Sequence, residues 1–214
     1  MRNGIRDRLL FLYKFLRSPR QFGSMTPSSR WLARAIISPL PWNELFNIAE
    51  LGAGTGAITK YLKAVTTKRT NVILFEKDSD LRRQLHLRFP GYRLYKDCLR
   101  LRLALHNSNL EKLDCIVSSL SFRNFSMVGR VQFMEQITAS LKEEGLFIAF
   151  EYFFPRMKRE LQQHFDILSI QYVPLNFPPA IVYICRKKTA ANAKQQTGRS
   201  LSLVPANNLV FLER

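Results

Sequence analysis

The fold of this 214-residue chain is decided by the stretch Asn47-Ile48-Ala49-Glu50-Leu51-Gly52-Ala53-Gly54-Thr55-Gly56. A short apolar run leads into the glycines, and a helical stretch follows them. Glycines at such a turn allow positive φ angles and let backbone amides approach a ligand without a steric clash. The G-x-G-x-G spacing is tighter than the G-x-G-x-x-G that seats a pyrophosphate, and Glu50 would repel a diphosphate. The stretch therefore favours a ligand with a cationic ammonium group over a plain strand-to-helix turn.

Apolar runs that alternate with helical stretches predict the architecture around this turn. We expect strands at 46–51, 72–75, 92–95, 115–118 and 146–150, and helices near 27–37, 57–66, 79–88 and 128–142. Such alternation indicates a parallel sheet with helices on both faces. Two later apolar runs, 165–172 and 180–185, have no helix between them and predict an antiparallel pair. The expected fold class is α/β: a doubly wound, Rossmann-like sheet, mostly parallel, with an antiparallel C-terminal strand pair.

Two more acids stand where the second and third strands should end. Glu76 comes twenty residues after Gly56, where a carboxylate can accept hydrogen bonds from both ribose hydroxyls. Asp97 comes twenty-one residues later, where a carboxylate can accept from an adenine amino group. Each acid alone could instead cap a helix or lie on the surface. Because ligands of open α/β sheets bind at the carboxyl ends of the strands, we expect Glu50, Glu76 and Asp97 to converge on one crevice.

The chain carries a large excess of positive charge. Thirty-three Lys and Arg face sixteen Asp and Glu, which gives a net charge of +17 and a pI near 10.3. This field favours an anionic partner, either nucleic acid or an acidic membrane leaflet. Residues 1–43 hold eight basic residues and one acid, and most apolar residues of 5–17 share one arc of a helix. A basic helix of this kind either lies in a membrane interface or caps the domain.

These patterns divide the chain into a basic amphipathic N-terminal helix (1–20), a main domain (21–188) and a polar C-terminal extension (189–214). The 46% content of hydrophobic residues excludes wholesale disorder. No run approaches the ~18 apolar residues that a membrane span needs. The three cysteines and three histidines share no spacing typical of disulfide frameworks or metal sites. We expect no metal and a cytoplasmic location.

The glycine stretch and the three acids resemble the class I S-adenosylmethionine-dependent methyltransferases. Three further stretches resemble the bacterial phospholipid N-methyltransferases within that class, a group related to the rRNA adenine dimethylases. They are 23–29 (GSMTPSS), 117–125 (VSSLSFRNF) and 176–183 (NFPPAIVY). The chain departs from that group at Ser121, Arg123 and Ser126, where proline, leucine and proline are more usual. The resemblance makes 21–188 the methyltransferase domain.

The resemblance also implies a role for each candidate site residue. The methionine end of S-adenosyl-L-methionine would lie against Glu50 and the glycines Gly52, Gly54 and Gly56. Its ribose would bind Glu76, and its adenine would bind Asp97. The acceptor site would be lined by Met25, Ser118, Ser119, Leu120 and Asn124. Glu151 and Tyr152, at the end of the expected fifth strand, are the candidate catalytic residues that would take a proton from the acceptor amine.

The function that the resemblance implies is transfer of methyl groups to the amine of an aminophospholipid, phosphatidylethanolamine or its methylated forms. The basic N-terminal helix would hold the enzyme on an anionic membrane surface, peripherally at the inner face of the membrane. One alternative is methylation of adenine in rRNA or another nucleic acid, which is disfavoured because 118–122 lack the proline and amide of a base-clamping motif. The other alternative is a non-catalytic basic binding module on the same fold.

Overall fold

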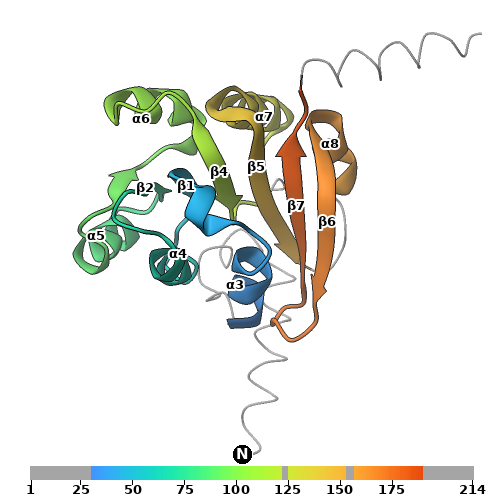
Figure 1. The fold of residues 1–214 in the computed structure, drawn as a ribbon, viewed down its shortest axis with the longest axis horizontal. Helices are drawn as coiled ribbons and strands as arrows, with labels where there is room; N and C mark the ends of the chain where they lie inside the picture. The colour runs from blue at the N-terminus through green and yellow to red at the C-terminus, as the bar shows by residue number, and fades with distance from the viewer. Residues whose placement is uncertain (1–29, 122–124, 153–156, 190–214) are drawn as a thin grey trace, which may run out of the picture.

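The computed structural model describes residues 30–121, 125–152 and 157–189 (Figure 1). The expected N-terminal helix (1–20) lies outside the described residues, as does the C-terminal extension beyond residue 189. Two of the expected acceptor-site residues, Met25 and Asn124, also lie outside them.

A seven-stranded sheet in the order β3-β2-β1-β4-β5-β7-β6 runs through the centre of the domain (Figure 1). The strands are β1 (Asn47–Leu51), β2 (Asn71–Phe75), β3 (Arg93–Tyr95), β4 (Leu113–Ser118), β5 (Leu141–Tyr152), β6 (Phe165–Val173) and β7 (Ala180–Lys187). The first five strands are parallel, and β7 is antiparallel to both of its neighbours, β5 and β6. The predicted doubly wound sheet with an antiparallel C-terminal pair is therefore confirmed.

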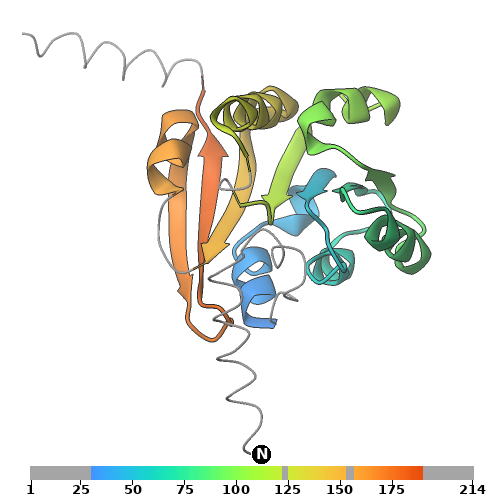
Figure 2. The same cartoon turned by 180° about the vertical axis from the view of Figure 1, so that it is seen from behind.

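Helices cover both faces of this sheet (Figures 1 and 2). They are α3 (Arg30–Ile37), α4 (Thr59–Val65), α5 (Ser79–Arg88), α6 (Leu101–Asn107), α7 (Met127–Ser140) and α8 (Lys158–His164), with short 3-10 turns η1 (Trp42–Glu44) and η2 (Cys98–Arg100). The expected helices near 57–66, 79–88 and 128–142 are confirmed, whereas α6 and α8 were not predicted. Within the described residues, no helix is long and apolar enough to cross a bilayer.

Side chains that alternate along each strand separate the core into two layers. On one face, α6, α7 and α8 pack on residues such as Ala49, Ile116 and Phe147. On the other, α3 and α4 pack on the residues next to these, such as Ile48 and Cys115. Because both faces are covered, the central strands are apolar at nearly every position, as is typical of parallel sheets.

One row of paired residues crosses the whole sheet near the carboxyl ends of its parallel strands. The row consists of Tyr95, Phe75, Leu51, Ser118, Ala149, Tyr183 and Ile170. The segments that follow Phe75, Leu51 and Ser118 therefore leave the sheet at the same level. β1 lies between β2 and β4, where the direction of strand order reverses, and ligands of open α/β sheets bind beside such a switch point.

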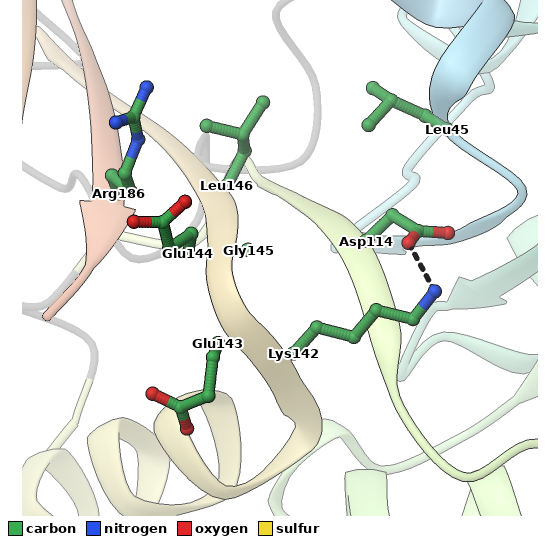
Figure 3. A pocket seen from close by; sticks show the side chains of 8 residues that line it. All are labelled: Leu45, Asp114, Lys142, Glu143, Glu144, Gly145, Leu146 and Arg186. Carbon is green, nitrogen blue, oxygen red and sulfur yellow. Dashed lines mark hydrogen bonds and ion pairs between the residues drawn. The ribbon is translucent and has the colours of Figure 1, made fainter. Parts of the chain in front are cut away.

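The opposite, amino edge of the sheet is held by Asp114 at the start of β4. Its carboxylate accepts hydrogen bonds from the backbone N–H groups of Phe46 (2.9 Å) and Asn47 (2.7 Å). It also pairs with Lys142 Nζ at 2.5 Å, inside a pocket formed with Leu45 and the first half of β5 (Figure 3). The contacts serve to fix β1, β4 and β5 to one another, and the pocket lies at the edge remote from the glycine stretch.

We expect Asp114→Ala to lower the free energy of unfolding by about 1–3 kcal/mol, because two backbone N–H groups lose a charged acceptor. Urea denaturation of the purified chain measures this change. The matched control is Asp80→Ala, which removes a salt bridge to Arg83 between side chains that are both more than 70% exposed. This control should cost less than about 1 kcal/mol. Equal losses in the two variants would contradict a special role for Asp114.

Candidate active site

The glycine stretch forms a tight turn between β1 and α4. Gly52, Gly54 and Gly56 have φ angles of 79°, 56° and 80°, in a region that residues with a Cβ rarely adopt. The backbone N–H groups of Gly52 and Ala53 both donate to the carbonyl of Phe75, at 2.8 and 2.9 Å. The end of β2 therefore holds the turn in place, and the chain needs glycine at these positions to follow it.

Glu50 lies beneath this turn and is 1% exposed. One oxygen of its carboxyl group accepts a hydrogen bond from Thr59 Oγ1 at 2.7 Å, across the turn at the first residue of α4. Burial raises the pKa of the Glu50 carboxyl to about 8, a value to which the hydrogen bond from Thr59 contributes a lowering and the nearby charge of Glu76 a smaller increase. The buried group is thus poised to hold its proton near neutral pH, or to lose it when a cation approaches.

Glu76 follows β2 and faces the same turn. Its two carboxylate oxygens accept from the backbone N–H groups of Gly54 (2.8 Å) and Asp78 (2.9 Å). A carboxylate has about four acceptor positions, so each oxygen keeps capacity for another donor. Glu76 is 8% exposed, so it keeps a small contact with solvent, whereas Glu50 is almost completely buried. This arrangement suits a ligand with two neighbouring hydroxyl groups.

Asp97 lies two residues beyond the end of β3. Its Oδ1 accepts from the backbone N–H of Leu99 at 2.9 Å and so caps η2, while its Oδ2 lies 3.8 Å from Arg100 Nε. The side chain is 48% exposed. The backbone N–H of Glu76 donates to the carbonyl of Tyr95 at 3.0 Å, which keeps the ends of β2 and β3 together. Asp97 is therefore the outermost of the three predicted acids.

The segment after β4 contacts the glycine turn directly. The backbone N–H of Ser119 donates to the carbonyl of Leu51 at 3.0 Å, and its hydroxyl donates to the carbonyls of Leu51 (3.1 Å) and Gly52. A Cβ placed on Gly52 would lie only 2.7 Å from Ser119 Oγ and from Leu120 Cδ2. The structure therefore brings the expected acceptor residues Ser118, Ser119 and Leu120 against the expected cofactor residues.

Glu151 and Tyr152 are neighbours in β5, and the structure does not bring their side chains together. Glu151 Oε1 accepts from Tyr183 Oη at 2.7 Å and from the backbone N–H of Met157 at 3.1 Å. Tyr152 packs edge-on against Phe150 in the core layer of α3 and α4. Burial raises the pKa of Tyr152 to about 12, so it keeps its proton at neutral pH. Successive strand residues point to opposite faces, and this alternation separates the pair.

Two residues at this edge were missed from the sequence. Thr59 supplies the hydroxyl that pairs with Glu50, and its position three residues after Gly56, at the start of a helix, was a usable signal. Tyr183 supplies the hydroxyl that binds Glu151 from β7. That contact depends on the antiparallel pairing of β5 with β7, and no spacing in the sequence indicates it.

Comparison with known proteins gives one curated relative and several structural neighbours. Ornithine lipid N-methyltransferase of Singulisphaera acidiphila is 31% identical over 186 residues, which cover 85% of this chain and 97% of the relative. No family model matches the chain.

Solved structures with the same fold include 1,6-didemethyltoxoflavin-N1-methyltransferase of Burkholderia thailandensis. It has a TM-score of 0.58 and 15% identity, and the match covers 85% of this chain and 87% of that one. A TehB-like S-adenosylmethionine-dependent methyltransferase of Corynebacterium glutamicum has a TM-score of 0.57 and 16% identity, with 86% and 100% covered. At such identities these likenesses show the fold alone.

Together with the 31% identity to a curated N-methyltransferase, the strand order and the glycine turn at the switch point define a class I methyltransferase that uses S-adenosyl-L-methionine as methyl donor. The residues fit that donor, because the glycine turn is bordered by a buried carboxyl group and by a carboxylate with free acceptor positions for a diol. More narrowly, the chain belongs to the N-methyltransferase family to which the ornithine lipid enzyme belongs. The predicted family, enzyme class and methyl donor are confirmed.

We expect Gly52→Ala to destabilise the fold by about 1–3 kcal/mol, because alanine is strained at this φ and its Cβ would overlap Ser119 and Leu120. Displacement of these residues should also weaken binding of S-adenosylhomocysteine. Denaturation and titration calorimetry measure the two effects. Gly91→Ala is the control, since a Cβ there meets no atom within 4 Å, and it should change stability by less than about 0.5 kcal/mol.

The raised pKa of Glu50 predicts a pH dependence of stability. From about pH 4.5 to about pH 8 the folded chain keeps a proton on Glu50 that the unfolded chain has released. Raising the pH through this window therefore lowers the free energy of unfolding, by roughly a few kcal/mol in total. Glu50→Gln, which has no such proton, should show a flatter profile in urea denaturation at about pH 5.5 and about pH 7.5. Parallel profiles for the two proteins would rule this effect out.

Proposed function

We propose that this enzyme methylates the primary amine of an amino lipid headgroup at a membrane surface. The observation that carries the proposal is the 31% identity, over nearly the whole relative, to an ornithine lipid N-methyltransferase. Ornithine lipid and phosphatidylethanolamine both present a primary amine close to an acidic group, a carboxylate in the first and a phosphate in the second. The relative favours the first headgroup, and the resemblance of 23–29 and 176–183 to phospholipid methyltransferases favours the second.

We propose the following roles for the residues around the glycine turn. Glu50 attracts the ammonium group of the methionine end, and Thr59 keeps its carboxyl oriented. Glu76 accepts hydrogen bonds from the ribose hydroxyls, and Asp97 accepts one from the adenine amino group at the outer end of the crevice. S-adenosyl-L-methionine, when bound, supplies a methyl group on a strongly electrophilic sulfonium. The chain mainly has to align an amine with that group and keep water away.

An amine must lose its proton before it can accept a methyl group. Desolvation of the amine lowers its pKa, and an acceptor must take the proton. Of the two expected catalytic residues, Tyr152 keeps its own proton, so we assign proton acceptance to Glu151. The hydroxyl of Tyr183 holds the Glu151 carboxylate at the carboxyl end of β5, two residues beyond Ala149, which pairs with Ser118. The excess of basic residues in 1–20 would attract the enzyme to an anionic membrane.

The direct test is methyl transfer from labelled S-adenosyl-L-methionine to vesicles that contain ornithine lipid or phosphatidylethanolamine. We expect label in at least one of these lipids and none in vesicles of phosphatidylcholine, whose amine is already quaternary.

Glu76→Gln should raise the Kd for S-adenosylhomocysteine by roughly tenfold or more, because it loses a charged acceptor. Arg83→Gln, in an exposed pair on α5, is the matched control and should leave that Kd unchanged. Label in added RNA and in neither lipid would overturn the proposal.

A further inference from the structure

The turn between β6 and β7 exposes apolar side chains for which the methyl-transfer chemistry has no use. Tyr172 and Leu175 are each 64% exposed, and Phe177 is 40% exposed. Residues 173–179 read Val-Pro-Leu-Asn-Phe-Pro-Pro and contain no charge. Ile170, two residues before Tyr172 in β6, is 45% exposed, and its side chain lies on the same face of the sheet as that of Tyr172. Together Ile170, Tyr172, Leu175 and Phe177 form a continuous segment that we call the apolar turn surface.

The turn is held in a fixed shape, so the exposure is not a consequence of a loose loop. Asn176, at its centre, is 2% exposed, and its side-chain amide donates to the carbonyl of Pro178 at 2.6 Å. The backbone N–H of Asn176 donates to the carbonyl of Val173 at 3.2 Å. The polar residue of the turn is thus turned inward while its apolar neighbours, Leu175 and Phe177, point to solvent. This is the reverse of the usual distribution in a surface turn.

Basic residues of α3 lie beside the turn on one face of the sheet. Ile170 and Tyr172 flank the turn on the other face, because their partners in β7 belong to the core layer of α6, α7 and α8. Leu32 and Ile36 of α3 pack in the same core layer as Val173 and Val182, and both views show α3 next to the turn (Figures 1 and 2). The other side of α3 presents exposed basic side chains. Arg30 and Arg34 are exposed, and the Arg30 guanidinium lies 4.9 Å from the ring centre of Trp31, which is 38% exposed. Residues 30–43 contain no acid.

This edge of the sheet also carries the glycine turn and the proposed acceptor segment. Ala180, at the end of the turn, pairs with Tyr152 at the end of β5, so the turn continues the carboxyl edge of the sheet. β7 lies two strands from β4 in the sheet order. At about 4.8 Å per strand, Tyr183 of β7 lies about 10 Å across the sheet from Ser118, and Ala180 lies three residues, about 10 Å, further along β7. The turn and the segment Ser118–Leu120 therefore leave the same edge of the sheet.

We infer that the apolar turn surface, together with Trp31, docks onto an anionic lipid bilayer and sets the active site at the headgroup level. Aromatic and aliphatic side chains enter the interface, while Arg30 and Arg34 contact lipid phosphates. A net charge of +17 opposes docking of a second copy of the chain and favours an anionic surface. The inference rests on the proposed function only for the delivery of the substrate, since docking itself is measured without methyl transfer.

The test measures sedimentation of the full chain with vesicles of phosphatidylcholine containing about one third phosphatidylglycerol. We expect the double variant Tyr172→Asp/Leu175→Asp to lose at least about tenfold in vesicle affinity, because two interface contacts are replaced by charges that anionic lipid repels. The matched control is Leu87→Asp, at a leucine that is 75% exposed near the end of α5, which lies at the opposite edge of the sheet from β6 and β7. It adds one negative charge where the double variant adds two, and it should lower vesicle affinity by less than about twofold.

A second measurement separates docking from catalysis. Methyl transfer to a short-chain amino lipid dispersed below its micelle concentration should be the same in the double variant and in the unchanged chain. Equal vesicle affinity in the double variant, or loss of affinity in Leu87→Asp to the same degree, would overturn the inference. The inference would also be overturned if light scattering showed that the unchanged chain is a dimer and the double variant a monomer, while the two bind vesicles equally. If the unchanged chain binds vesicles through this surface but methylates no lipid, docking stands and the proposed function fails.

Discussion

The burial of one carboxyl group, that of Glu50, is the constraint on which the site depends. A carboxyl group removed from water needs a partner, and Thr59 provides one from the first residue of α4. The chain must therefore reverse from β1 to α4 within a few residues, close over the carboxyl and leave room for a ligand. Three glycines with positive φ make that path possible, and the end of β2 fixes it through the carbonyl of Phe75. A larger residue at Gly52 would push against the acceptor segment.

The glycine turn is hydrogen-bonded to the segment after β4 on one side and to Glu76 on the other. Ser119 is bonded to the carbonyls of Leu51 and Gly52, so the position of the acceptor segment follows that of the glycine turn. Glu76 is bonded to the backbone of Gly54 from the other side. The turn is consequently held between β2 and β4 rather than by its own sequence. The relative position of Glu76, the glycine turn and Ser119 is therefore set by the register of the sheet as much as by the individual side chains.

Much of this arrangement could be predicted from the sequence, because local patterns determine it. Periodicity gave the seven strands and the longer helices, and the sheet class followed from their order. Helix α8 (KRELQQH) escaped prediction because it buries a single apolar side chain, Leu161, and so shows no apolar periodicity. Helix α6 (LRLALHN) was missed although it buries three apolar side chains at helical spacing. The placement of Glu76 beside the glycine turn could be predicted because both come directly after neighbouring parallel strands, whose carboxyl ends lie at the same edge of the sheet. The bond from Tyr183 to Glu151 could not be foreseen, because it depends on antiparallel register between distant segments.

The two tryptophans of the chain, Trp31 and Trp42, lie at opposite ends of one short segment and in opposite surroundings. Trp42 is 8% exposed, and its indole N–H donates to the carbonyl of Ile37 at 2.6 Å, so its environment is set by the fold. Trp31 stands at the surface beside Arg30. Intrinsic fluorescence therefore contains one constant and one variable component. A shift of the emission maximum toward shorter wavelengths would therefore come from Trp31. The fluorescence of the native protein thus reports when the exposed side of α3 moves into an apolar environment.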